Sequence, residues 1–124
     1  MTIVSHQELS PTPFAGLTHR TLAGAEHGLS SLAVWVQRIE AGGATPPHRH
    51  DCEEVVVIQE GAGTLIMYGR EHSFRAGDTL IVPRNEVHQI INSGSATLQL
   101  LAALSQAPVA PELPDGTPIA LPWQ

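Results

Sequence analysis

The chain has 124 residues, of which 42% are apolar, 12 are acidic and 6 are basic, so its formal net charge at pH 7 is −6. This length and apolar content suit one domain with one packed core and argue against a disordered chain. All of the basic residues are Arg, and their scarcity argues against binding to nucleic acids or to anionic membranes. Gly contributes 11 residues and Pro 10, a turn-rich composition that disfavours a helical bundle.

The single cysteine, Cys52, excludes an intrachain disulfide, so the fold needs no oxidising compartment. The first residues show no basic region followed by an apolar stretch, and we therefore expect no signal peptide. No apolar run reaches the roughly 20 residues that span a bilayer. Together these features predict a soluble, cytoplasmic protein.

Runs of Val, Ile, Leu and Thr that are separated by Gly, Pro, Asn or Asp predict a series of strands. In chain order these runs cover residues 29–43, 53–63, a hairpin at 64–74 that turns around Gly69 and Arg70, then 76–83, 86–94 and 97–105. Periodicity alone leaves the last run open between strand and short helix, and its place after so many strands favours strand. Short strands at regular spacing predict an all-β sandwich or barrel, which we assign to residues 1–107.

Residues 108–124 hold half of the prolines of the chain, so we expect an extended Pro-rich C-terminal tail. A frayed tail is one interpretation. Ile119, Leu121 and Trp123 are apolar at alternating positions, however, which equally suggests packing on the barrel or on a neighbouring subunit.

Candidate metal-binding chemistry centres on His48-Arg49-His50. Residues two apart in an extended segment share a face, so both imidazoles can point at one atom. Glu54 follows four residues after His50, and His88 comes later, in the run that begins after Pro83. Three neutral imidazoles and one carboxylate are a strong donor set for a divalent metal.

The same residues resemble two motifs of the cupin superfamily. The first motif, G-x5-H-x-H-x3-4-E-x6-G, is matched by Gly42, His48, His50, Glu54 and Gly61. The second motif, G-x5-P-x-G-x2-H-x3-N, is matched by Gly77, Pro83, His88 and Asn92, with Asn85 in place of the central glycine. Asn is the residue that best tolerates a positive φ after Gly, so we expect the turn at Asn85 to survive.

The resemblance implies a double-stranded β-helix, the jelly-roll barrel of cupins, with one divalent transition metal per chain. Its ligands would be His48, His50, Glu54 and His88. Fe, Mn or Ni suits this mixed donor set better than Zn, which usually prefers four ligands. The neighbouring Glu53 is a rival carboxylate that the motif spacing disfavours.

The remaining histidines and the cysteine are not expected to bind the metal. His6, His19, His27 and His72 are expected at the surface or in loops, and Cys52 as an ordinary reduced thiol.

A divalent metal with one carboxylate and neutral histidines carries a net charge of about +1, which favours an anionic small-molecule ligand. Polar side chains on the predicted strands are candidates for lining the ligand cavity. These candidates are Gln37, Arg38, Tyr68 and Gln99, with Arg84 as a further cation.

Three functions are compatible with this pattern. A metal-dependent dioxygenase of small organic substrates is the favoured one. A sugar or sugar-acid isomerase or lyase, and a non-catalytic small-molecule-binding protein, are the alternatives. Both faces of residues 55–58 are apolar, so the outer face is expected to meet another sheet or another subunit, and a homodimer is predicted.

Overall fold

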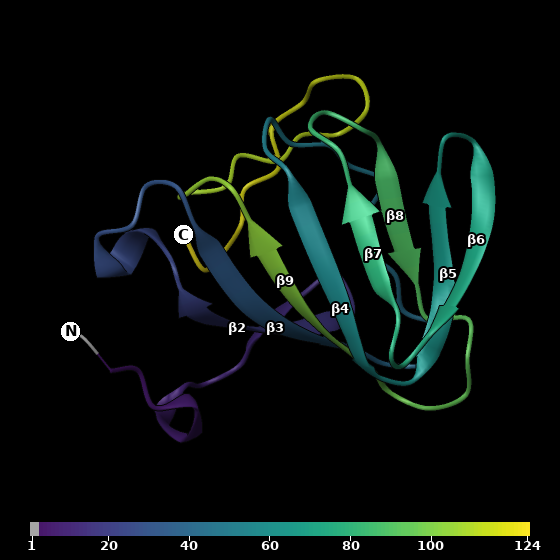
Figure 1. Ribbon diagram of the computed structural model, residues 1–124, viewed down its shortest axis with the longest axis horizontal. Coiled ribbons are helices and arrows are strands. Elements are labelled where there is room, and N and C mark those ends of the chain that lie inside the picture. The colour runs from purple at the N-terminus through teal and green to yellow at the C-terminus, as the bar shows by residue number, and fades with distance from the viewer. Residues whose placement is uncertain (1–2) are drawn as a thin grey trace.

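The computed structural model describes residues 3–124, which form nine strands arranged in two antiparallel sheets (Figure 1). The larger sheet has the order β1-β2-β3-β9-β4-β7, formed by Thr12–Phe14, Leu17–Ala23, Ala33–Ile39, Leu98–Leu104, Glu54–Glu60 and Thr79–Val82. The smaller sheet has the order β6-β5-β8, formed by Arg70–Arg75, Ala62–Met67 and His88–Ile91. This architecture confirms the expected all-β class.

Alternation along the strands of the larger sheet decides which side chains enter the barrel. In β3 and β9 every second residue is buried, from Ala33 to Ile39 and from Leu98 to Leu104. The two strands pair in register, with Gln37 opposite Leu100, so their inward residues form continuous rows. Most of these inward residues are aliphatic, and the rows therefore supply one wall of the hydrophobic core.

The structure differs from the sequence-based prediction at three places. β1 and β2 were not assigned individually, and the long strand expected at 29–43 is shortened to Ala33–Ile39. The hairpin between β5 and β6 turns at Tyr68 and Gly69, one residue earlier than predicted. Both residues have positive φ, 56° and 68°, which is the backbone that matches the twist of a two-residue hairpin.

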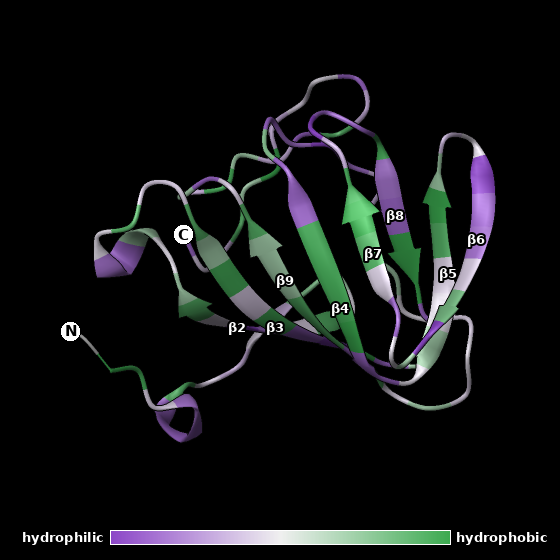
Figure 2. Ribbon diagram, viewed as in Figure 1, coloured by the Kyte–Doolittle hydropathy of each residue, from purple (hydrophilic) through white to green (hydrophobic). Residues whose placement is uncertain are grey.

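The outer face of the larger sheet is apolar across its β4 and β7 strands, which are largely coloured as hydrophobic in Figure 2. Val55, Val57 and Ile81 point outward and are exposed, whereas Val56 and Ile58 point inward and are buried. Val55 lies directly opposite Ile81 in the sheet. No other element within residues 3–124 covers these three side chains, and the homodimer stays a prediction.

The C-terminal segment, residues 108–124, runs back over one end of the barrel (Figure 1). Val109 and Pro111 are buried, and the Gln124 side chain bonds to both the N–H and the carbonyl of Val109. The only helices within residues 3–124 are the two 3₁₀ turns His6–Glu8 and Ala25–His27. Neither approaches the length or the apolar character of a membrane-crossing helix.

Candidate metal centre

Two segments meet at the candidate metal centre: the extended stretch 42–50 and strand β8. His48 and His88 exchange both backbone hydrogen bonds, at 3.0 and 2.9 Å, and so lie directly opposite each other. Further along, the N–H of Thr45 donates to the carbonyl of Ile90, and the N–H of Asn92 donates to the carbonyl of Gly43. This pairing explains how a histidine distant in sequence joins the His-x-His pair.

The turn before β8 closes the same region. Asn85 has φ 63°, and the turn is retained with Asn in place of the motif's glycine, as expected. Its N–H donates to the carbonyl of His50 at 2.8 Å, and its side-chain amide donates to Asp51. Asn92 donates through its side-chain amide to the carbonyls of Ile39 and Ala96 and thereby holds the far end of β8.

Each of the three histidines has its Nδ1 atom bonded to a backbone carbonyl. His48 donates to Pro46 at 2.7 Å, His50 to Cys52 at 3.1 Å, and His88 to Glu86 at 2.8 Å. A proton on Nδ1 leaves Nε2 as the atom available to a metal, and such bonds also fix the orientation of each ring. The backbone therefore orients all three imidazoles as Nε2 donors.

The donor atoms of His48, His50 and His88 all lie within 4.8 Å of one another. Glu54 Oε1 lies 3.0 Å from His50 Nε2 and 3.2 Å from His88 Nε2. His88 Nε2 is buried and has no hydrogen-bond partner, although the carboxylate is so close. The unpaired Nε2 lone pair of His88 faces a carboxylate oxygen, and a cation between the two atoms would bind both. The residues present therefore fit a divalent metal.

Burial and mutual contacts shift the protonation of the cluster. Burial, together with the charge of His88, lowers the pKa of His48 to about 4, so this ring is neutral at pH 7. Burial also acts to lower the pKa of His50, but the bonds to Cys52 and Glu54 outweigh it and the pKa is raised. Burial acts to raise the pKa of Glu54, but the bond to His50 and the nearby charge of His88 outweigh it, so the net shift is downward. Without metal, a proton therefore lies between His50 and Glu54.

Cys52 is fully buried beside the cluster but does not face it. Its Sγ lies 3.4 Å from His50 Nδ1, on the side of the ring opposite the Nε2 donor. The thiol is therefore no candidate ligand.

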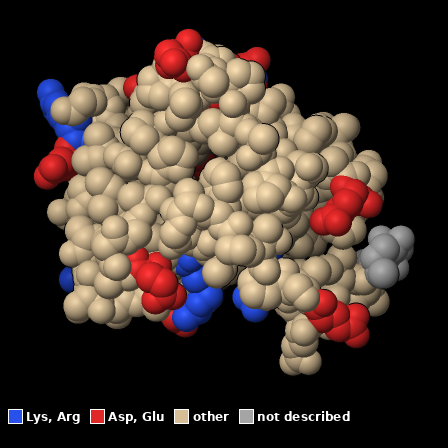
Figure 3. Space-filling model, turned by 180° about the vertical axis from the view of Figure 1, so that it is seen from behind, with Lys and Arg blue, Asp and Glu red and all other residues tan. Residues whose placement is uncertain are grey.

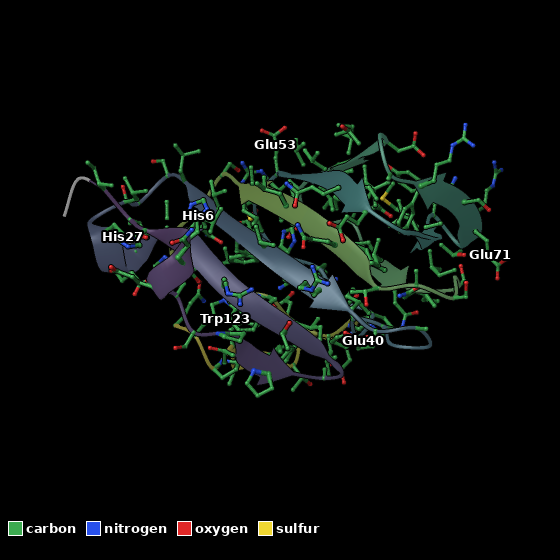
Figure 4. The ribbon with its side chains drawn as sticks, turned by 90° about the horizontal axis from the view of Figure 1, so that it is seen from below. His6, His27, Glu40, Glu53, Glu71 and Trp123 are labelled. Carbon is green, nitrogen blue, oxygen red and sulfur yellow. The ribbon has the colours of Figure 1, made fainter. Side chains whose placement is uncertain are left out.

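A cavity of about 60 Å³ opens beside the donors and is mostly apolar. Its walls come from β1, β2, β3, β8, β9, the stretch before His48 and the C-terminal segment. The C-terminal segment contributes Val109, Pro111, Ile119, Leu121 and Trp123. Figure 4 shows Trp123 beside the N-terminal strands, whereas Glu53 and Glu71 lie at the periphery. The alternating apolar residues noted in the sequence thus line the cavity.

Of the four candidate ligand-binding residues, the structure brings only Gln37 into the cavity wall. Arg38 follows it on β3 and so points to the outer face, where it donates to the Gln99 side chain and lies 3.9 Å from Glu60. Gln99 is likewise outward on β9, because Leu98 and Leu100 point inward. The expectation that Arg38 and Gln99 line the cavity is corrected by strand parity.

Two further expectations of a ligand-binding role are also corrected. Tyr68 lies in the β5–β6 turn, is 59% exposed and does not line the metal cavity. Arg84 is paired with Asp51 at the surface and does not line it either. On the face shown in Figure 3, the charged side chains lie mostly around the margins.

His19 is a functional candidate that the sequence analysis missed. It was expected at the surface or in a loop, but it lies on β2, is 1% exposed and stacks on Trp123. A sequence signal existed, because Leu17, His19 and Thr21 alternate as one face of a strand. Because no strand was predicted at β2, the alternation alone did not indicate that His19 is buried.

A family model described as "Auxin binding protein" matches residues 4–116. The chain belongs to the auxin-binding protein family. Auxin-binding protein 1 of Arabidopsis thaliana is 38% identical over 104 residues, which cover 76% of this chain and 52% of that protein. Auxin-binding protein 4 of Zea mays is 35% identical over 105 residues, with 76% and 52% covered. The chain thus spans about half the length of these relatives.

Solved structures with this fold include a small RmlC-like cupin from Shewanella frigidimarina, with TM-score 0.76, 18% identity and 87% of this chain and 93% of that chain covered. The polyketide cyclase RemF from Streptomyces resistomycificus matches with TM-score 0.73 and 24% identity over 88% and 83% of the two chains. These likenesses show that this member of the auxin-binding protein family has the jelly-roll fold of these cupin structures.

Proposed function

We propose that this protein binds a small carboxylic acid with an apolar body, and that a divalent metal held by His48, His50, Glu54 and His88 anchors the carboxylate. The observation that carries the proposal is the cavity itself, in which the donor cluster forms part of an otherwise mostly apolar wall. The polarity of this lining matches a ligand with one charged end and one apolar end.

The charge of the site supports an anion. Three neutral imidazoles and the Glu54 carboxylate around a divalent cation leave about one positive charge. Among residues 3–124 no Lys or Arg lines the cavity, so a bound metal would supply the positive charge there. A bound metal would act as the electrostatic anchor for the ligand.

The residue types in the cavity wall also help to distinguish a binding protein from a sugar isomerase or lyase. Apart from the four donors, its lining includes no titratable side chain. A sugar isomerase or lyase needs a positioned acid or base at the reacting atoms, and only the donors themselves are present for that role. The wall therefore favours binding over the isomerase or lyase alternative.

The names of the relatives also support a carboxylic acid ligand, because the matching family and its members in A. thaliana and Z. mays are called auxin-binding proteins. We infer that an aromatic acetate is the type of acid to test first. The aromatic side chains Phe14, Trp35 and Trp123 on the cavity wall suit a flat apolar group.

Calorimetric titration of the metal-loaded protein with indole-3-acetate tests the proposal. We expect saturable binding with one site per chain, and much weaker binding to the metal-free protein. Indole-3-acetamide, which has the same ring but no negative charge, is the matched control and should bind at least tenfold more weakly. Equal affinity for the acid and the amide would refute the anchoring role of the metal.

The dioxygenase expected from the sequence remains the second candidate, favoured by the donor set of three imidazoles and one carboxylate. Iron suits this set for oxygen chemistry, and manganese or nickel also fits it. Oxygen consumption by the iron-loaded protein in the presence of diketones, flavonols or thiols distinguishes an oxygenase from a binder. Turnover with any of them would replace the binding proposal by the catalytic one.

A further inference from the structure

His19 is the most deeply buried histidine outside the metal cluster, and the proposed function does not use it. It is 1% exposed and lies on the inward face of β2. Its ring stacks on Trp123, with centroids 3.5 Å apart and planes inclined by 10°, and meets Trp35 edge-on at 5.0 Å. His19 is thus packed between β3 and the end of the C-terminal segment.

Both ring nitrogens of His19 are engaged in hydrogen bonds. Gln37 Nε2 lies 3.1 Å from His19 Nδ1, and His19 Nε2 lies 2.7 Å from Thr21 Oγ1. A neutral imidazole carries one proton, so when Gln37 donates to Nδ1 the proton sits on Nε2 and is donated to Thr21. No ring nitrogen is left over for a ligand or a metal.

These contacts place His19 directly behind two residues of the cavity wall. Gln37 and Trp123 line the cavity, and His19 does not. Because the Gln37 amide nitrogen is directed to His19, its carbonyl oxygen is the polar atom left for the cavity. The Trp123 ring lies against the face of the same imidazole.

We propose that His19 is a positioning residue of the ligand site, which orients the Gln37 amide and holds the Trp123 ring in the cavity wall without contacting metal or ligand. This inference rests on the proposed binding function. It predicts that changes at His19 reach the ligand through Gln37 and Trp123, and leave the metal donors unaffected.

A double-mutant cycle in the metal-loaded protein measures how strongly His19 acts on ligand binding through Gln37. His19→Phe keeps a ring that can stack on Trp123 but removes both ring nitrogens, and Gln37→Met keeps the length of the Gln37 side chain but removes its amide. An amide oxygen only accepts hydrogen bonds, so the Gln37 carbonyl would accept from the indole N–H of the ligand and not from its carboxylate. We expect H19F to weaken indole-3-acetate binding about tenfold, which is the loss of that one buried hydrogen bond. In the Q37M background, H19F should cause less than a twofold further loss.

The affinity for the metal alone provides the internal control. H19F should change it by less than twofold, and the matched variant His72→Phe on exposed β6 should change neither affinity. Additive losses of acid affinity in the cycle, or an equal loss of metal affinity in H19F, would overturn the positioning role.

A measurement without ligand separates this inference from the proposed function. In the ¹⁵N–¹H spectrum, the side-chain amide signals of Gln37 should shift toward those of an exposed glutamine in H19F. Unchanged Gln37 signals would overturn the inference whether or not the acid binds. If the wild-type protein binds no acid while these signals do move, the binding function fails and the His19–Gln37 coupling stands.

Thr21→Val offers a second variant if H19F does not fold. It removes the acceptor of the His19 Nε2 proton and retains the imidazole. We expect a smaller change of the same kind, with about a threefold loss of acid affinity and a shift of the Gln37 amide signals. No effect of T21V on either measurement would also contradict the proposal.

Discussion

Arg49, the residue between the two donor histidines, is paired with Glu112 through both backbone and side chain. Each donates its backbone N–H to the carbonyl of the other at 2.9 Å, and Arg49 Nε lies 2.7 Å from Glu112 Oε1. The C-terminal segment is therefore attached directly to the stretch that carries His48 and His50. The apolar wall of the cavity and its donors are parts of one connected unit.

Glu112→Gln removes the ion pair of this connection but keeps its backbone bonds. Both side chains are about one-third exposed, so solvent screening limits the expected loss to at most about 1 kcal/mol of unfolding free energy. The metal affinity should stay within about twofold, because the backbone pairing still orients the donor stretch. Thermal unfolding at low and high salt measures the loss, which should shrink as salt rises. A large drop in metal affinity would show that the side-chain pair, rather than the backbone, orients the donors.

Single substitutions of the donor histidines test the metal centre. His50→Ala and His88→Ala should each abolish tight binding, because each removes one of three Nε2 donors that converge within 4.8 Å. His72→Ala serves as the control, since its imidazole lies on exposed β6 and bonds to the carbonyl of Met67. Elemental analysis after incubation with Fe, Mn or Ni, followed by desalting, gives the metal content per chain. Similar losses in all three variants would mean that the donors are not these histidines.

Metal binding should release about one proton per site near neutral pH. The pKa of His50 is raised above its ordinary value of 6.5, so the metal-free site holds a proton there that the metal displaces. The pKa of Glu54 is lowered and that of His48 falls to about 4, so neither contributes a proton at pH 7. The apparent metal affinity should therefore rise about tenfold per pH unit between about pH 4, the pKa of His48, and about pH 10, the raised pKa of His50, and fall more steeply below about pH 4. Calorimetry in buffers of different ionisation enthalpy counts the proton, and an affinity independent of pH would contradict the assignment.

Trp123→Ala should open the cavity wall at the C-terminal segment. The ring contacts His19, Trp35 and Phe14, so its loss should cost about 3 kcal/mol of stability. We expect indole-3-acetate to bind at least tenfold more weakly while the metal affinity changes little, because Trp123 contacts no donor histidine through its ring. Calorimetric titration with metal and with acid separates the two effects. Equal loss of both affinities would show that the segment supports the donors and not the ligand.

The prediction of a homodimer rests on the apolar outer face of β4 and β7. Val55, Val57 and Ile81 are exposed there, where contact with a second copy would remove them from water. Light scattering at micromolar concentration should give twice the mass of one chain. A monomeric mass would refute the prediction.

Several features were readable from the residues because they depend on local spacing. The His48-Arg49-His50 spacing puts two imidazoles on one face of an extended segment, and the positive φ of Asn85 follows from its place in the motif. The strand near residues 97–105 also follows from local composition, and the structure gives it as Leu98–Leu104. Such features can be predicted because they depend only on residues that are close in sequence.

Other features could not be read in this way. Gln37 and Arg38 are adjacent polar residues on one strand, and strand parity sends only Gln37 into the cavity. Parity could not be assigned before the strand bounds were known, because shifting a register by one residue exchanges the two faces. His19 was missed for the same reason, since its strand was not assigned.

The sequence by itself determined the all-β class, the family resemblance and the candidate metal ligands, because these are carried by residue types at short, regular spacings. Only the tertiary structure decided that His88 lies opposite His48, that Trp123 stacks on His19, and that the C-terminal segment forms a wall of the cavity. These are contacts between segments far apart in the chain. They depend on how the two sheets and the C-terminal segment pack together, which local spacing does not encode.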